Sequence, residues 1–192
     1  MKEQLAAYIR LALKNPKEED IQPILDIFEV KNFLKEDHFK LYHTEGTEVG
    51  FLLSGSARIS VAKGSGEKVT GNIVYKHQFI ADFISMRTEG KTPLAIDFLE
   101  PSIVLVAPIQ AVNKLLETNL TFNRFIREYI MDNIAEFMKL YMYFIVGTAK
   151  DRYEYILGNN PELLKNIPLH FIAEMIGVTP TQLSRIRNKK IK

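Results

Sequence analysis

The first half of the chain changes from a helical to a strand-like pattern of apolar positions. Residues 3–13 carry apolar side chains at helical spacing, and residues 18–28 can begin a second short helix. From about residue 29 to residue 107, short apolar runs alternate with turns that contain Gly, Ser or Pro. These runs lie at 49–54, 57–62, 68–75 and on both sides of the turn at Pro101 and Ser102. Such spacing is typical of antiparallel hairpins, so we expect a sandwich or small barrel.

The pattern becomes helical again after the strands, first at 108–119 and then from 121 to about 150. The longer segment carries apolar residues at steps of three and four: Ile126, Ile130, Ile134, Phe137, Tyr141 and Phe144. Around 137–146 the helix is apolar on nearly every face, which indicates burial from more than one side. One side can be covered by the barrel of the same chain, and the other needs a second molecule. We therefore expect a homodimer formed through the helix 121–150. The alternative is the central helix of a monomeric bundle, which the small number of other helices disfavours.

Residues 169–188 fit two short helices that pack against each other around a tight turn. The first helix needs a small residue where the two helices touch, and Ala173 is there. The turn needs a residue that tolerates a positive φ, and Gly177 is there. Thr179 can cap the second helix, with Pro180 at its first helical position. The segment therefore predicts a helix-turn-helix.

The second of these helices has one polar face. With Leu183 and Ile186 turned inward, the opposite face can reach base edges, and Arg185 can pair with guanine. Arg187 and Lys189 are placed to meet phosphates. The predicted DNA-binding residues are Thr179, Thr181, Gln182, Ser184, Arg185, Arg187, Asn188 and Lys189. The alternative is an ordinary surface hairpin of two helices with solvated lysines.

The distribution of charge supports a polyanion partner for this end of the chain. Residues 151–192 contain seven Lys or Arg and four Asp or Glu, which gives this segment a net charge of +3, whereas the whole chain has +2. The rest of the chain is therefore close to neutral. The chain has no Cys, which excludes disulfides and thiol catalysis. No apolar run has transmembrane length and no signal-peptide core is present, so we expect a cytoplasmic protein without a membrane partner.

Several motifs resemble those of bacterial Crp/Fnr-family transcription regulators. The segment "IPLHFIAEMIGVTPTQLSRIR" resembles the family's DNA-reading segment, "FLLSGSARI" is similar to the opening of its β-roll, and the long helix matches its dimerisation helix. The resemblance implies an α+β fold with an N-terminal antiparallel β-roll, jelly-roll-like, with flanking helices, a long dimerisation helix and a C-terminal helix-turn-helix. It divides the chain into a sensor domain at 1–120, the helix at 121–150 and a DNA-binding domain at 151–192.

The resemblance also implies partners. A homodimer would read a palindromic site on double-stranded DNA, with RNA polymerase and a small-molecule effector as further partners. No enzyme signature is found.

The effector domain departs from the family's cyclic-nucleotide binders. There, a Gly-Glu pair and a later Arg-Ser or Arg-Thr pair hold the ligand. Here the corresponding residues are Ala81-Asp82 and Thr92-Pro93, so no Arg is present to neutralise the phosphate. We expect a different effector or none, no cofactor, and a pocket near Asp82, Ser85 and Arg87.

Two alternatives remain open. The chain can be a small-molecule-binding β-barrel protein with a vestigial DNA module. It can also be a cupin-type metal enzyme, although its four His lack the His-x-His pair of such sites, and we predict no metal site.

Overall fold

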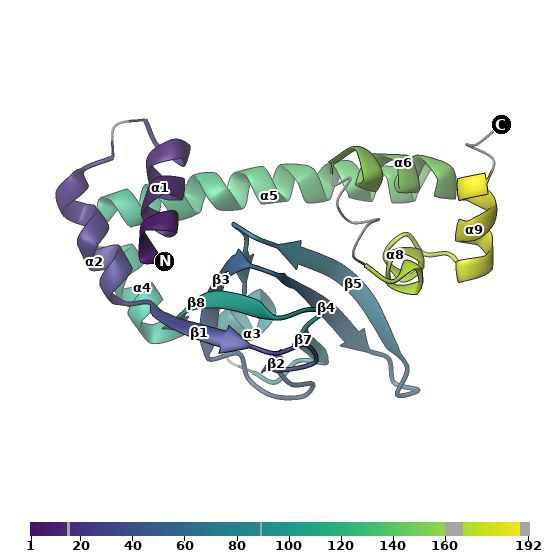
Figure 1. The fold of residues 1–192 in the computed structure, drawn as a ribbon, viewed down its shortest axis with the longest axis horizontal. Helices are drawn as coiled ribbons and strands as arrows, with labels where there is room; N and C mark the ends of the chain where they lie inside the picture. The colour runs from purple at the N-terminus through teal and green to yellow at the C-terminus, as the bar shows by residue number, and fades with distance from the viewer. Residues whose placement is uncertain (15, 89, 160–166, 189–192) are drawn as a thin grey trace. The chain divides into compact units, whose positions relative to one another are not determined.

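The computed structural model describes residues 1–14, 16–88, 90–159 and 167–188 (Figure 1). The chain forms two compact units. The first unit comprises Met1–Lys68 and Asn72–Ile130, and the second comprises Val69–Gly71 and Met131–Lys192. The strands belong mainly to the first unit and the C-terminal helices to the second, with one long helix that contributes to both.

Two four-stranded sheets form the β-roll. The order in the first sheet is β1 (Glu29–Phe33), β8 (Ser102–Pro108), β3 (Glu48–Ser54) and β6 (Phe79–Ile80). The order in the second sheet is β2 (His38–Lys40), β7 (Leu94–Phe98), β4 (Ser56–Ala62) and β5 (Lys68–Tyr75). The pairings of β8 with β1 and β3, and of β7 with β2 and β4, are antiparallel. The predicted antiparallel roll is confirmed.

The turn between β3 and β4 shows why the sequence has glycine there. Gly55 has a φ of +88°, which favours glycine, and a Cβ atom would lie 2.1 Å from the hydroxyl oxygen of Ser102. The two strands that meet at this turn contribute Leu52 and Ala57 to a buried cluster, together with Ile96, Phe98 and Val104 from β7 and β8. The turn therefore places strands of different sheets over one core.

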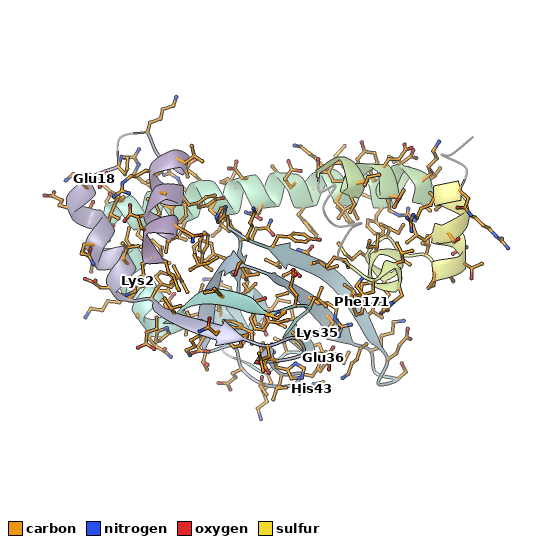
Figure 2. The ribbon with its side chains drawn as sticks, viewed as in Figure 1. Lys2, Glu18, Lys35, Glu36, His43 and Phe171 are labelled. Atoms are coloured by element: carbon orange, nitrogen blue, oxygen red, sulfur yellow. The ribbon has the colours of Figure 1, made fainter. Side chains whose placement is uncertain are left out.

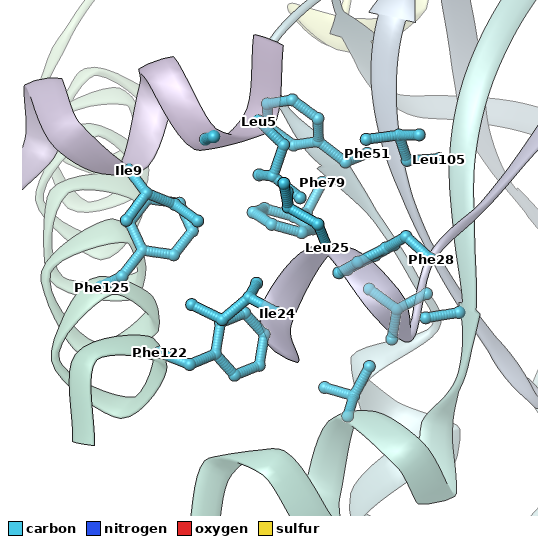
Figure 3. Packing of buried hydrophobic residues seen from close by; sticks show 14 of the residues in the cluster. Leu5, Ile9, Ile24, Leu25, Phe28, Phe51, Phe79, Leu105, Phe122 and Phe125 are labelled. Carbon is cyan, nitrogen blue, oxygen red and sulfur yellow. The ribbon is translucent and has the colours of Figure 1, made fainter. Parts of the chain in front are cut away.

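Helices pack against the strands within the first unit and complete a second core. They are α1 (Lys2–Ala12), the 3₁₀ turn η1 (Glu18–Asp20), α2 (Ile21–Asp26), α3 (Phe83–Thr88), α4 (Ile109–Thr118) and the start of α5 (Leu120–Val146). Figure 3 shows Ile9 of α1 beside Phe125 of α5, and Leu5 of α1 beside Phe51 and Phe79 from the strands. Each of these buried side chains stabilises the fold by about 1.5–3 kcal/mol. The flanking helices predicted around the roll are thus part of its core.

The second unit contains the rest of α5, then α6 (Ala149–Asn159), α8 (Leu169–Met175) and α9 (Pro180–Asn188). The long helix ends at Val146, near the end expected at about residue 150. The amide of Thr148 donates to the Asp151 carboxylate at 2.7 Å, and the amide of Asp151 donates back to the Thr148 hydroxyl at 3.3 Å. This reciprocal cap starts α6, so Lys150 belongs to a new helix.

The C-terminal half of α5 carries an uncovered apolar surface. Its exposed apolar side chains include Ile130, Met131, Ile134, Phe137, Met138, Tyr141, Met142, Phe144 and Ile145. Phe137 is 66% exposed and Ile145 is 62% exposed, although both are large apolar residues on one regular helix. Exposed apolar surfaces of this kind are typical of interaction sites. No helix among the described residues is long and apolar enough to cross a membrane.

Candidate nucleic-acid interface and effector pocket

The end of α8 is shaped by a backbone motif that requires glycine. Ile176 is the C-cap of α8, and Gly177 follows it with a φ of +69°. The amide of Gly177 donates to the carbonyl of Glu174 at 3.0 Å, and the amide of Val178 donates to the carbonyl of Ala173 at 2.9 Å. These are the two hydrogen bonds of a Schellman motif, which reverses the chain after a helix. The turn predicted at Gly177 is confirmed in this form.

The start of α9 is fixed by a capping box. The amide of Gln182 donates to the Thr179 hydroxyl at 3.2 Å, and the amide of Thr179 donates to the Gln182 side-chain oxygen at 2.9 Å. Both residues were predicted to contact DNA, and both have a structural role here. The predicted N-cap at Thr179 is confirmed, and Pro180 is the first residue of the helix.

Apolar side chains fill the space between α8 and α9. Ile172, Ala173, Ile176 and Leu183 are almost fully buried, as the sequence predicted. Ala173 is buried completely, so no larger side chain fits at that point without moving the helices. The two helices are therefore held in a defined orientation.

The opposite face of α9 is exposed. Its exposed residues are Thr181, Gln182, Ser184, Arg185 and Asn188, while Arg187 is partly buried. Lys189 lies outside the described residues. The side chains beside Arg185 on this face are short, so the helix backbone can come close to the edges of base pairs. This face supplies hydroxyl, amide and guanidinium groups, the side chains that read base edges in a major groove.

The pocket predicted around Asp82 contains a buried ion pair. Lys40 Nζ lies 3.0 Å from the Asp82 carboxylate, and the two side chains are 4% and 0% exposed. Lys40 also donates to the carbonyl of Leu94 at 2.7 Å and to the hydroxyl of Thr92 at 3.1 Å. Asp82 accepts hydrogen bonds from the Thr92 hydroxyl and, at 3.0 Å, from the amide of Ser85. The ammonium and the carboxylate thus satisfy each other inside the roll.

The charge of Asp82 is stabilised by this network. Burial by itself raises the pKa of the Asp82 carboxyl, but hydrogen bonds from Thr92, the Ser85 amide and Lys40, together with the Lys40 charge, outweigh burial and lower that pKa below its ordinary value. Asp82 is therefore ionised at neutral pH, and its counter-ion is a side chain of the same molecule.

One cavity lies beside the pair, and a second is lined by residues of α3 and α4. The first has a volume of about 320 Å³, and its wall includes Lys40, Glu45, Glu48 and Asp82. The second has a volume of about 250 Å³, and Ser85 is in its wall. Arg87 is exposed on α3. Of the three residues predicted to form an effector pocket, Asp82 lines the first cavity and Ser85 lines the second, while Arg87 lines neither of these two.

Solved structures supply the comparison with known proteins, since no family model and no curated protein matches the sequence. FixK2 from Bradyrhizobium japonicum has a TM-score of 0.70 at 13% identity, covering 85% of this chain and 84% of its own. A CooA mutant from Carboxydothermus hydrogenoformans has a TM-score of 0.68 at 17% identity, covering 86% of this chain and 77% of its own. A putative transcriptional regulator of the Crp/Fnr family from Eubacterium rectale has a TM-score of 0.67 at 13% identity, covering 91% of this chain and 84% of its own.

The chain has the fold of the Crp/Fnr regulators. The predicted order of an antiparallel roll, a long helix and a helix-turn-helix is confirmed for this Crp/Fnr fold. The TM-scores show the shared fold, and identities of 13–17% leave the ligand and the DNA sequence to be argued from the residues themselves.

Within the Crp/Fnr fold, one important residue escaped the sequence reasoning. Lys40 lies between Phe39 and Leu41 on a three-residue strand, where alternation alone gives no reason to expect a buried cation. The histidines do not form a common metal site in the described residues. His38 lies on β2, His43 (labelled in Figure 2) lies in the turn that follows it, and His170 lies on α8; all three are exposed. His77 instead stacks on Phe51, with 6.2 Å between the ring centroids.

Proposed function

We propose that this protein is a transcription regulator of the Crp/Fnr family that binds double-stranded DNA as a homodimer. Residues 151–192 would form the DNA-binding domain, 121–150 would join two copies, and 1–120 would be the sensor domain. Such a regulator would work in the cytoplasm, where DNA and RNA polymerase are present. The observation that carries the proposal is the exposed polar face of α9, presented by a capped and tightly packed helix-turn-helix in this fold.

The roles of the α9 residues follow from their placement. Arg185, Ser184, Thr181 and Asn188 share the exposed face and would read bases. Arg187 and Lys189 would contact phosphates. Thr179 and Gln182 would contribute chiefly by holding the first turn of α9, because their side chains are used in the cap.

A dimer would account for the exposed surface of α5. Ile130, Ile134, Phe137 and Tyr141 follow steps of three and four and are all exposed on the single chain. A second copy of the same helix offers a matching stripe, so two copies would bury each other's apolar side chains as in a coiled coil. The pairing would also place two α9 helices on one DNA site.

The sensor domain would not hold a cyclic nucleotide in the way of the family's cyclic-nucleotide binders. Lys40 already neutralises Asp82, and the Asp82 oxygens are used by Lys40, Thr92 and the Ser85 amide. The wall of the larger cavity adds Glu45 and Glu48, so a phosphate would meet carboxylates there. A different effector, or none, fits the roll better.

Binding to duplex DNA at several salt concentrations tests this function. We expect the affinity to fall steeply with salt, because Lys and Arg displace counter-ions from phosphates. Arg185→Ala should weaken binding to a selected site by about 1–3 kcal/mol. Lys63→Ala is a matched control, because it removes one exposed positive charge from the β4–β5 hairpin. A wild-type protein that is not retained on duplex DNA even at low salt would instead support the vestigial module.

Calorimetric titration with cyclic nucleotides tests the sensor domain. No heat of binding is expected, and saturable binding would contradict the proposal that the roll does not hold a cyclic nucleotide.

A further inference from the structure

Arg152 binds the C-terminal ends of two other helices. It lies in the first turn of α6, and its Nε donates to the carbonyl of Ile176 at 2.8 Å. Its Nη1 donates to the carbonyl of Gly147 at 3.3 Å. Ile176 is the C-cap of α8, and Gly147 directly follows the last residue of α5. A single side chain thus joins the end of α5 to the turn of the helix-turn-helix.

These carbonyls need a partner of this type. The Schellman motif uses the carbonyls of Ala173 and Glu174, while the carbonyl of Ile176 points out of the motif and accepts from Arg152. The C-terminal end of a helix also carries partial negative charge, which a cation stabilises. A guanidinium has donors in a fixed planar fork and can serve two carbonyls at once, whereas a Lys ammonium is a point charge.

The ring of Phe144 completes the junction. The guanidinium carbon of Arg152 lies 4.7 Å from the centroid of that ring, which is cation–π geometry. Phe144 Cε1 is also the nearest atom to a Cβ built on Gly177, at 3.4 Å. The last turn of α5 therefore contacts the turn between α8 and α9 directly, and the Arg152 side chain joins the two through hydrogen bonds to backbone carbonyls.

We propose that Arg152 is a positioning residue that makes the orientation of α9 follow the position of α5. The consequence for DNA rests on the proposed function. Two recognition helices must reach half-sites one helical turn apart, about 34 Å along the duplex. With Arg152 in place, the pairing of two α5 helices sets that separation; without it, each helix-turn-helix turns about Gly147 and the separation varies.

Three variants separate positioning from charge. Arg152→Met keeps an unbranched apolar stem over Phe144 and removes all donors. Arg152→Lys keeps the cation but not the fork. Lys150→Met is the matched control. Lys150 is exposed on the same turn of α6, and its ion pair with Glu154 is long, at 3.9 Å. It removes the same charge without touching either carbonyl.

The first measurement is independent of DNA and of dimer formation. Because the chain has no Cys, Asp132→Cys and His170→Cys introduce the only two labelling sites, one on α5 and one on α8, both at exposed positions. Pulsed electron paramagnetic resonance of the doubly spin-labelled protein, diluted into unlabelled protein, reports the distance within one chain. We expect a narrow distribution for the parent and for Lys150→Met, a broad one for Arg152→Met, and an intermediate width for Arg152→Lys.

The second measurement is the affinity for a selected DNA site and for random duplex. Arg152→Met should lower the specific affinity by about tenfold, equivalent to about 1.4 kcal/mol, and leave the non-specific affinity unchanged. If the parent binds no DNA, the proposed function fails while the distance distribution still decides the role of Arg152. Circular dichroism checks folding, and if Arg152→Met unfolds, Arg152→Lys supplies the comparison. Parental widths in the folded Arg152 variants would overturn the proposal.

Discussion

Replacing Lys40 by Met removes one half of a buried ion pair and leaves the other half in place. The Asp82 side chain is 0% exposed, and the ammonium at 3.0 Å is its counter-ion. In Lys40→Met the carboxylate keeps its hydrogen bonds from Thr92 and the Ser85 amide but loses the opposite charge. The carbonyl of Leu94 loses its 2.7 Å donor at the same time. Breaking a buried pair in this way costs about 3–5 kcal/mol, and we expect a loss of stability in that range.

Urea denaturation followed by circular dichroism measures this cost, since the chain has no Trp to report by fluorescence. The double variant Lys40→Met with Asp82→Asn removes both charges, so it should be more stable than Lys40→Met alone. Lys63→Met is the control for an exposed pair, because Lys63 and Glu67 are more than half exposed, and its loss should stay within about 0.5 kcal/mol.

The reasoning would be refuted if Lys40→Met lost no more stability than Lys63→Met. It would also be refuted if adding Asp82→Asn to Lys40→Met lowered the stability further instead of restoring part of it. Either result would mean that Lys40 and Asp82 do not stabilise each other. The claim that Lys40 neutralises Asp82 inside the roll would then be wrong.

Three further predictions concern pH, the cap of α9 and the dimer. The pKa of Asp82 is below its ordinary 3.8 in the folded protein, so its stabilisation is present above that pH and is lost as the pH falls through the lower folded value; Asp82→Asn should flatten the acid side of a stability–pH profile, and an unchanged slope would contradict this. Thr179→Ala removes the cap of α9 and should cost about 1 kcal/mol in thermal melting, whereas Ser184→Ala should leave the melting temperature unchanged. Phe137→Glu places a charge on the exposed apolar surface of α5 and should give a monomer in analytical ultracentrifugation, while Arg124→Glu nearer the start of that helix should not.

The features that the sequence predicted well depend on local chemistry. Gly177 and Thr179 stand where a Schellman motif and a capping box need them, and these motifs involve residues only a few positions apart. The runs at β3, β4 and β5 were visible because their turn residues separate them. The end of the long helix was expected at about 150, and α5 ends at Val146; the Thr148–Asp151 cap is the local signal that a new helix begins there.

The features that escaped depend on contacts between distant segments. Lys40 meets Thr92 across 52 positions, and Arg152 meets Ile176 across 24. Both contacts exist only after β2 has paired with β7 or after α8 has packed beside α6. No pattern within β2 marks Lys40 as buried, and Arg152 in "AKDRYEY" reads as an ordinary surface charge of an amphipathic helix. Partners of this kind follow from the register of strands and the packing of helices.

Selection of bound fragments from random duplex DNA tests the proposed function most directly. A dimer that presents two α9 helices should enrich an inverted repeat whose half-sites are centred about 10 base pairs apart, and Arg185→Ala should relax the enrichment at one position in each half. Recovery of unenriched DNA at every round, or of a single half-site without symmetry, would contradict a dimeric regulator that reads DNA through α9.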